Sequence, residues 1–350
     1  MRAVRLPVLL LWLAVLAGAS GFGPPTFGYG DPFSYRVSAS DLAALQAAPP
    51  LPAGVRAAGA AIVDAGTGHA LASRGADARL APASLTKMMT ALVAVDRASL
   101  ADTIRASERS LSEPVIIGLA PGDALPLEFM LYGLLLTSGN DAALAIAESV
   151  GGGSIERFIV WMNERAVAMG LSNTHFANPT GLDQTGHYSS ARDMAEIARA
   201  VMAEPTLARI VATRRHTVDG PPLYLFVNTN PLLGTYPGVD GVKTGYTDDA
   251  GPSFAASAVR DGRRLVSVIL NSSNIARETE SLLDWAFALP PITLDVPRAG
   301  FAAVHDGSLA SSSGRTAPLV AWERPFLRAF STRASTSIWL AGRRLVEWPR

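Results

Sequence analysis

The sequence predicts an α+β fold, in which a five-stranded antiparallel sheet is flanked by helices and carries a helical subdomain. Two strand-like segments lie early in the chain, three lie late, and the segments between them have helical periodicity. Helices on the faces of such a sheet bury its apolar side chains. We therefore expect one sheet whose first two and last three strands come from opposite ends of the domain.

The first two strands form a hairpin. A small apolar strand spans residues 58–63, and the turn residues of 64–68 lead into a second strand that ends near Ser73. A helix beginning near Ser84 follows Pro82. Its apolar positions, which include Leu85 and Met88, form one stripe and predict a buried helix.

The remaining elements follow in order. Helices are expected near 128–136, from 141 to the glycines at 151–153, over 155–169 and over 191–202. Strands are expected over 239–247, 253–260 and 265–270, and a final helix over 275–287. Asp261-Gly262 joins the last two strands, a dipeptide typical of a tight hairpin turn.

The ends of the chain differ from this domain in composition. Arg2 and Arg5 precede an apolar run and small residues, a pattern that predicts a signal peptide over 1–19, with an uncleaved anchor as the alternative. Residues 20–54 are rich in Gly and Pro and indicate an N-terminal tether, and the predicted domain covers 55–289. The protein is therefore expected to be exported to the periplasm or cell envelope. A peripheral position on the inner membrane is compatible with this expectation.

Residues 290–350 are expected to form a short C-terminal region. A helical projection places Ile338, Trp339, Leu345 and Trp348 on one side, with arginines on the other. Such an amphipathic helix can make peripheral contact with an anionic membrane surface. A helix packed on the protein's own core has the same pattern, so both alternatives stay open.

Composition excludes several classes of function. The formal net charge is zero, which gives no basis for binding nucleic acid. The chain has no cysteine, and its five histidines lack metal-ligand spacing on one helix face. We therefore expect neither a metal site nor a cofactor.

Ser84 and Lys87 are the first candidate catalytic residues. Their spacing places both on one helix face. Burial lowers the pKa of a lysine, and a neutral amine can take a proton from a serine hydroxyl. The 30 Lys+Arg residues include only two lysines, Lys87 and Lys243, which suggests that both have chemical roles that arginine cannot fill. A capped helix with an exposed lysine is the alternative.

Two further motifs accompany this pair. Ser138-Gly139-Asn140 supplies a hydroxyl that can pass a proton and an amide that can orient an amine or a substrate carbonyl. Lys243-Thr244-Gly245 lies on a predicted strand, where the glycine lets a substrate backbone approach the strand edge. Lys243 and Thr244 can then hold a terminal carboxylate. Taken singly, each motif also fits a plain turn or a solvated strand.

In this order, the three motifs match a signature shared by penicillin-binding proteins and class A β-lactamases. The chain resembles the serine D-alanyl-D-alanine carboxypeptidases, which are low-molecular-mass penicillin-binding proteins, over roughly residues 55–289. Segments 63–68, 178–182, 188–193 and 238–241 carry the resemblance further. It implies a β-lactamase/transpeptidase-like fold, peptidoglycan stem peptides as substrates and inhibition by β-lactam antibiotics.

The resemblance also implies a role for each site residue. Ser84 attacks the penultimate carbonyl with Lys87 as base, Ser138 relays a proton, and Asn140 binds the substrate amide. The backbone N–H groups of Ser84 and Tyr246 form an oxyanion hole. The terminal carboxylate is held by Lys243, Thr244 and Arg277, although Arg277 is equally compatible with a plain surface arginine.

Three competing functions stay open at the level of sequence. A β-lactamase needs a device for rapid hydrolysis of the acyl-enzyme, and the nearest look-alike is Glu204. A non-catalytic penicillin-binding or peptidoglycan-sensing module would not need a deprotonatable lysine. A DD-endopeptidase uses the same machinery as a carboxypeptidase, so the sequence does not separate these two activities.

Overall fold

The computed structural model describes residues 51–65, 69–219 and 223–289, together with the backbone of five short strands beyond them. The chain divides into two units, Pro49–Pro290 and a second unit made of Met1–Ala48 with Pro291–Arg350. The predicted signal peptide and almost all of the predicted tether lie outside the described residues.

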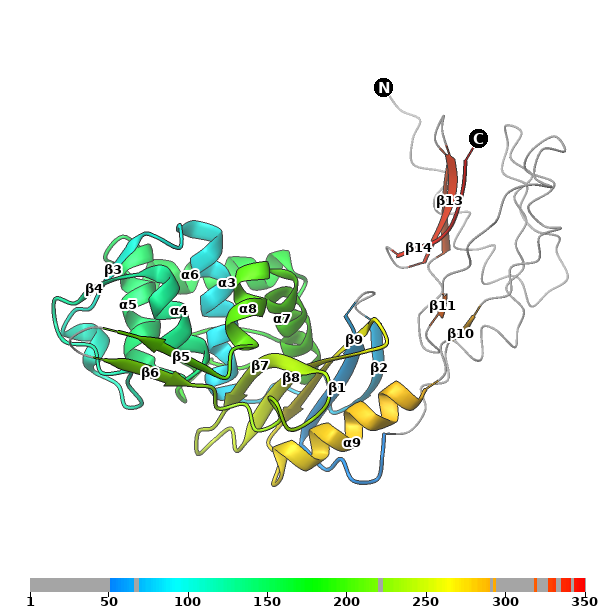
Figure 1. Ribbon diagram of the computed structural model, residues 1–350, viewed down its shortest axis with the longest axis horizontal. Coiled ribbons are helices and arrows are strands. Elements are labelled where there is room, and N and C mark those ends of the chain that lie inside the picture. Colours follow the sequence, from blue (N-terminus) through cyan, green and yellow to red (C-terminus); the bar gives the residue numbers. More distant parts are fainter. Residues whose placement is uncertain are drawn as a thin grey trace, which may run out of the picture. The chain divides into compact units, whose positions relative to one another are not determined.

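A five-stranded antiparallel sheet forms the centre of the first unit, with strand order β2-β1-β9-β8-β7 (Figure 1). The strands are β1 (Gly59–Asp64), β2 (His69–Arg74), β7 (Val239–Gly245), β8 (Ser253–Arg260) and β9 (Arg263–Leu270). Strand β1 pairs with β9, so the two ends of the domain meet in one sheet as the sequence predicts. The predicted fold class is confirmed.

Helices cover both faces of this sheet. Helix α7 (Ala191–Ala203) and helix α9 (Ile275–Ala288) both contact β1, β8 and β9, and they lie on opposite sides of the sheet (Figure 1). Strands covered on both faces need apolar side chains throughout, and β8 is buried from Ser253 to Ala258. This double cover explains why most side chains of β8 and β9 are apolar.

The helical subdomain packs beside the sheet (Figure 1). Its helices are α3 (Lys87–Arg97), α4 (Leu127–Leu135), α5 (Asn140–Val150), α6 (Ile155–Ala168) and α8 (Pro205–Val211). The sequence did not predict α8 or two small antiparallel strand pairs, β3 (Thr103–Arg105) with β4 (Ala124–Pro126) and β5 (Arg215–Val218) with β6 (Tyr224–Val227). Strand β6 is held by tertiary packing, since Tyr224 and Phe226 make edge contacts with Phe129.

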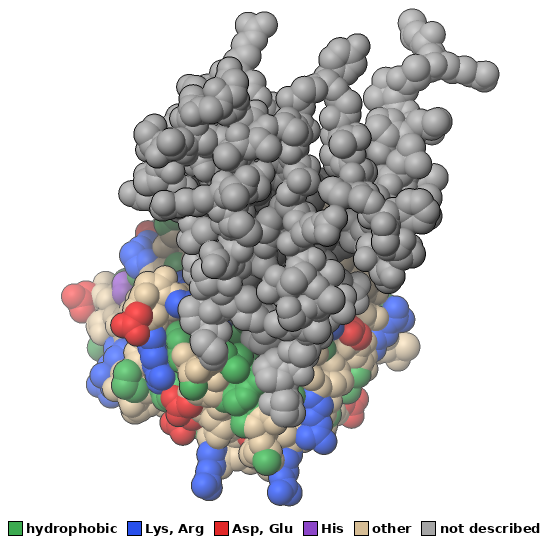
Figure 2. Space-filling view, turned by 90° about the vertical axis from the view of Figure 1, so that its right-hand side faces the viewer, with side chains coloured by type: hydrophobic (Ala, Val, Ile, Leu, Met, Phe, Trp, Pro, Cys, Tyr) green, Lys and Arg blue, Asp and Glu red, His purple; other side chains and the backbone are tan. Residues whose placement is uncertain are grey.

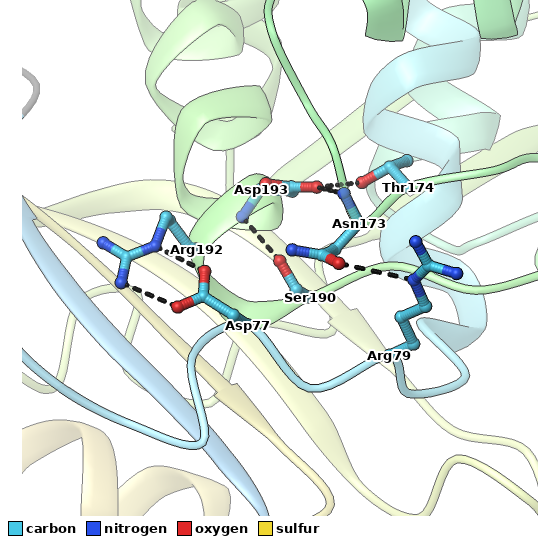
Figure 3. Close-up of polar contacts among 7 residues, drawn as sticks. All are labelled: Asp77, Arg79, Asn173, Thr174, Ser190, Arg192 and Asp193. Atoms are coloured by element: carbon cyan, nitrogen blue, oxygen red, sulfur yellow. Dashed lines mark hydrogen bonds and ion pairs between the residues drawn. The ribbon is translucent and has the colours of Figure 1, made fainter.

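A polar cluster fixes the segment that leads into Ser84 (Figure 3). Arg192 donates two hydrogen bonds to the Asp77 carboxylate, at 2.6 and 3.0 Å. Ser190 caps α7, and Asp193 accepts from the Asn173 backbone and the Thr174 hydroxyl. These contacts join the β2 side of the domain to the start of α7, which accounts physically for Ser190, Arg192 and Asp193 in the 188–193 segment.

The predicted C-terminal amphipathic helix is wrong. The second unit contains a three-stranded antiparallel sheet of β12 (Leu327–Ser331), β13 (Ser335–Leu340) and β14 (Arg343–Pro349). Thr, Ile, Val and Trp favour strands, and Gly342 interrupts any helix over this stretch. The membrane contact that depended on such a helix therefore has no structural support. The second unit also contains a pair of short strands, β10 (Ile292–Thr293) with β11 (Pro318–Leu319).

On the visible part of the described surface, basic and acidic side chains are interspersed (Figure 2), as the zero net charge suggests. Among the described helices, none combines the length and apolarity needed to span a bilayer.

Candidate active site

Ser84 and Lys87 lie where a short 3-10 helix, η2 (Ala83–Thr86), passes into α3. Lys87 is the first residue of α3 and is fully buried, while Ser84 is half-buried. The Lys87 Nζ atom lies 2.9 Å from the Ser84 Oγ atom. The shared face predicted from their spacing is therefore present, as a direct hydrogen bond.

The other partners of Lys87 determine how it can act. Its Nζ atom lies 2.7 Å from Oδ1 of Asn140 and 2.6 Å from the carbonyl oxygen of Thr180. Both partners are oxygens that only accept hydrogen bonds. A neutral amine has two N–H groups and one lone pair, so these two acceptors occupy both N–H groups. The lone pair then faces the Ser84 hydroxyl, as a base requires.

Electrostatics favours the neutral amine. Burial, assisted by the positive charge of Lys243, lowers the pKa of Lys87 well below its ordinary value, while Glu113 and Asp141 act in the opposite direction. A lysine at position 87 therefore loses its proton more readily than an exposed lysine does, whereas an arginine there would stay charged.

Asn140 and Ser138 come from the connection between α4 and α5. Asn140 begins α5; its Nδ2 atom donates to the carbonyl of Pro114 at 2.6 Å, so that Oδ1 faces Lys87. Ser138 is half-buried two positions earlier and has a φ of 68°, in the left-handed region. The turn therefore places the serine immediately beside the residue that binds Lys87.

Strand β7 supplies Lys243, Thr244, Gly245 and, just after it, Tyr246. Lys243 is buried; its Nζ atom donates to the Thr244 carbonyl at 2.9 Å, and burial lowers its pKa to about 7. The Thr244 hydroxyl lies 2.6 Å from that of Thr229. The Tyr246 side chain is exposed and donates to Asp248.

Two glycines let neighbouring backbone reach the turn that carries Ser84. A Cβ atom on Gly245 would stand 3.0 Å from the Ser84 nitrogen, and one on Gly181 would stand 1.9 Å from the Ala83 carbonyl oxygen. Gly181 also has a φ of 89°. These contacts place Lys243-Thr244-Gly245 and the 178–182 segment against the turn that carries Ser84.

Arg277 is less closely tied to this group. It is exposed in the first turn of α9, where its backbone N–H donates to Asn274. Among the described residues, no hydrogen bond or ion pair joins its side chain to Lys243 or Thr244. Within the same part of the chain, no group of carboxylates and histidines is arranged to hold a metal ion.

Three residues near the site were not predicted. Glu113 interacts electrostatically with Lys87, although no motif contains it. The buried Asp141 carboxylate accepts from the N–H groups of Ile117, Gly118 and Leu119 and so fixes the loop over Asn140. His187 lies 2.8 Å from the Thr86 hydroxyl, and burial lowers its pKa to about 4.

Glu204, the look-alike considered for a β-lactamase, has a structural role. Its carboxylate accepts a hydrogen bond from the Leu207 backbone at 2.6 Å and caps helix α8. This capping role could have been predicted from the position of Glu204 directly before Pro205, since proline favours the first turn of a helix.

An α+β domain in which a serine is hydrogen-bonded to a buried lysine beside a Lys-Thr-Gly strand is the arrangement of the class of serine acyl-transferring enzymes that act through a lysine. Within that class, the chain belongs to the D-alanyl-D-alanine carboxypeptidase family, whose profile matches residues 44–274. The predicted resemblance is thereby confirmed.

Sequence relatives agree with this family. The chain is 38% identical over 242 residues to the D-alanyl-D-alanine carboxypeptidase DacF of Bacillus subtilis, covering 65% of this chain and 61% of that protein. It is 38% identical over 244 residues to DacA of Escherichia coli K12, covering 65% of this chain and 59% of that protein. It therefore spans about three fifths of the length of these two relatives.

Solved structures of the same fold have similar sequences. A D-alanyl-D-alanine carboxypeptidase from Mycobacterium tuberculosis H37Rv matches with a TM-score of 0.65 and 35% identity, over 70% of this chain and 95% of that one. The Streptomyces K15 DD-transpeptidase matches with a TM-score of 0.65 and 31% identity, over 69% of this chain and 100% of that one.

Proposed function

We propose that this chain is a serine D-Ala-D-Ala carboxypeptidase that removes the terminal D-alanine from peptidoglycan stem pentapeptides and is inhibited by penicillins. The observation that carries the proposal is the 2.9 Å contact between Lys87 Nζ and Ser84 Oγ, made by an amine whose two N–H groups have other acceptors. Family membership supports the choice of substrate.

In this proposal, the Ser84 Oγ atom attacks the penultimate carbonyl while its proton moves to Lys87. The backbone N–H groups of Ser84 and Tyr246 stabilise the oxyanion, a contribution of about 2.7–4 kcal/mol per donor in other acyl-transfer enzymes. Ser138 passes a proton to the departing D-alanine amine. Water then hydrolyses the ester on Ser84 and releases the shortened peptide.

Substrate binding is assigned to the second lysine and its neighbours. Lys243, Thr244 and Arg277 hold the terminal carboxylate, and Asn140 binds the substrate amide. Strand β7 is the last strand of the sheet and has one unpaired edge, along which the peptide can lie. Gly245 has no side chain to obstruct the peptide there. Arg277 is exposed in the structure, and its backbone N–H donates a hydrogen bond to Asn274.

The test is release of D-alanine from a pentapeptide, measured beside acylation by a labelled penicillin. Wild type is expected to do both, whereas Ser84→Ala and Lys87→Arg lose acylation by at least about a thousandfold. Release that survives both substitutions contradicts the mechanism. Labelling without release from any stem peptide favours a penicillin-binding sensor instead.

The group that accepts the acyl chain in the second step decides which reaction the enzyme completes. The structure is similar to that of a DD-transpeptidase, so both water and an amine should be tested as acceptors of the acyl group. Product analysis on purified muropeptides distinguishes carboxypeptidase, endopeptidase and transpeptidase action. Rapid penicillin turnover would favour a β-lactamase; Glu204, the residue considered for that role, caps a helix instead.

The domain organisation belongs to the same proposal. Residues 1–19 act as an export signal, 20–54 as a tether and 55–289 as the catalytic domain, with 290–350 as a short C-terminal region. Its place of action is then the periplasm or cell envelope. N-terminal sequencing of the protein from fractionated cells tests the cleavage after Ala19.

A further inference from the structure

Glu113 is a half-buried acidic residue at the edge of the active site, and it has no part in the mechanism proposed for Ser84 and Lys87. One of its carboxylate oxygens, Oε2, is inaccessible to solvent and has no hydrogen-bond partner among the described residues. Such orphaned buried oxygens are rare in folded proteins and call for an explanation.

The backbone that carries Glu113 is fastened to the site. The carbonyl of Pro114 accepts from the Asn140 side chain at 2.6 Å, and the carbonyl of Val115 accepts from the Asn140 backbone at 2.7 Å. Asn140 in turn binds Lys87. One hydrogen bond from the side chain of Asn140 and one from its backbone therefore hold the residues after Glu113 to the residue that binds Lys87.

Val115 indicates that this placement is enforced. It has a φ of 64°, and a β-branched residue in the left-handed region is strained. Strain of this kind persists only where the surrounding contacts determine the conformation, and it concentrates at functional sites. Here the surrounding contacts are the two hydrogen bonds to Asn140.

We propose that Glu113 is a positioning residue for the catalytic base: its carboxylate, held beside the site through Asn140, stabilises the Lys87 ammonium and so shifts the pH range over which that amine can activate Ser84. The inference rests on the proposed function. When Ser84 transfers its proton, Lys87 becomes an ammonium, and the negative charge of Glu113 stabilises that ammonium. The proton later leaves through Ser138, so Glu113 neither gains nor loses one during the cycle.

Four charged or titratable groups act on Lys87 from the elements around it. Lys243 on β7 disfavours the ammonium, Glu113 and Asp141 favour it, and His187 also interacts with it. Burial raises the pKa of Glu113, while the Thr180 hydroxyl and Lys87 lower it. Glu113 differs from Asp141, whose carboxylate is occupied by backbone N–H groups.

The test is the pH profile of acylation by a labelled penicillin. Glu113→Gln removes the charge but keeps the shape, so the acidic limb should move to lower pH because the lysine loses its proton more easily. The plateau rate should fall on the order of tenfold, because a weaker base accepts the serine proton less well. Glu108→Gln is the matched control: it neutralises an exposed glutamate of the same segment and should leave the profile unchanged.

A second variant covers the case in which Glu113→Gln does not fold. Thr180→Val keeps Glu113 and removes a hydroxyl that lowers the pKa of its carboxyl, so it should move the limb in the same direction by less. Because that hydroxyl also donates to Asn178 at 3.1 Å, the circular dichroism of this variant is compared with that of the wild type. Glu113→Asp, which retains a charge, should restore the wild-type limb. An acidic limb that stays in place in both charge-weakening variants, or moves to higher pH, overturns the inference. Wild type that is not labelled at any pH contradicts the proposed function instead.

Discussion

Gly245 of β7 lies against the backbone of Ser84, so that a Cβ atom at position 245 would stand 3.0 Å from the Ser84 nitrogen and 3.2 Å from the Leu85 nitrogen. These are backbone atoms of the turn that carries Ser84, the proposed nucleophile. Even a methyl group therefore has to push β7 and η2 apart, at the place where the oxyanion is expected to bind.

Gly245→Ala should lower acylation by labelled penicillin about tenfold to a hundredfold, because displacements of about 1 Å in an active site have effects of that size. Circular dichroism should remain that of the wild type. Gly54→Ala is the control, since a Cβ atom there meets only the Ser281 hydroxyl at 3.7 Å. Equal acylation rates in Gly245→Ala and wild type would show that this close approach has no part in catalysis.

Lys243 should reduce stability at neutral pH. Burial lowers its pKa in the folded protein to about 7, from an ordinary value of 10.5, so the unfolded chain binds more protons between these values and stability rises with pH across that window. Lys243→Met should be more stable than wild type at pH 7 by about 1–4 kcal/mol. Urea unfolding measures it, and the advantage should shrink towards pH 10.5. An advantage that does not change with pH would assign the effect to packing.

Loss of the proton from Lys243 should also weaken the binding of a carboxylate ligand. Below about pH 7 Lys243 carries its proton and attracts a carboxylate, and above that pH the free protein loses this attraction. The second-order rate of acylation by a penicillin should therefore decline as pH rises beyond 7. The methyl ester of the same penicillin, which has no carboxylate, should show no such decline. A decline of equal size with both compounds would point to another group.

Asp141 should hold the loop beside the active site. Its buried carboxylate accepts hydrogen bonds from three successive backbone N–H groups, at 2.9 to 3.3 Å, and from Ala142. Asp141→Asn replaces one acceptor oxygen by a donor and should cost about 1–3 kcal/mol. Hydrogen exchange should become faster at residues 117–119. Asp123→Asn, which loses an acceptor for the single N–H of Ala120, should change stability less.

Hydrophobic periodicity and turn residues predicted most of the helices and strands. The predicted strand over 253–260 has the observed bounds, and the helix predicted over 155–169 is one residue shorter in the structure. The two small strand pairs were missed because their strands depend on distant partners, as Phe226 does on Phe129. The C-terminal helix was wrong because a helical projection ignored Gly342 and the β-branched residues around it.

The sequence motifs identified the main site residues, but they did not predict the polar residues around them. Serine, lysine and asparagine at fixed spacings indicated Ser84, Lys87 and Asn140, and the structure joins these three by hydrogen bonds. Glu113 has no motif, because a carboxylate that acts across a loop can occupy many sequence positions. The role of Thr180 was equally hidden, since its backbone carbonyl is the group that binds Lys87.

Glu278, on the last helix of the domain, holds the segment that leads into β1. Its carboxylate accepts from the backbone of Arg56, 222 positions earlier, and of Ala57. During synthesis, β1 leaves the ribosome long before β9 and Glu278 exist, so the sheet cannot be completed co-translationally until almost all of the domain has emerged. A fragment that stops before β9 would leave β1 with an unpaired edge where β9 belongs, and it is expected to aggregate or be degraded.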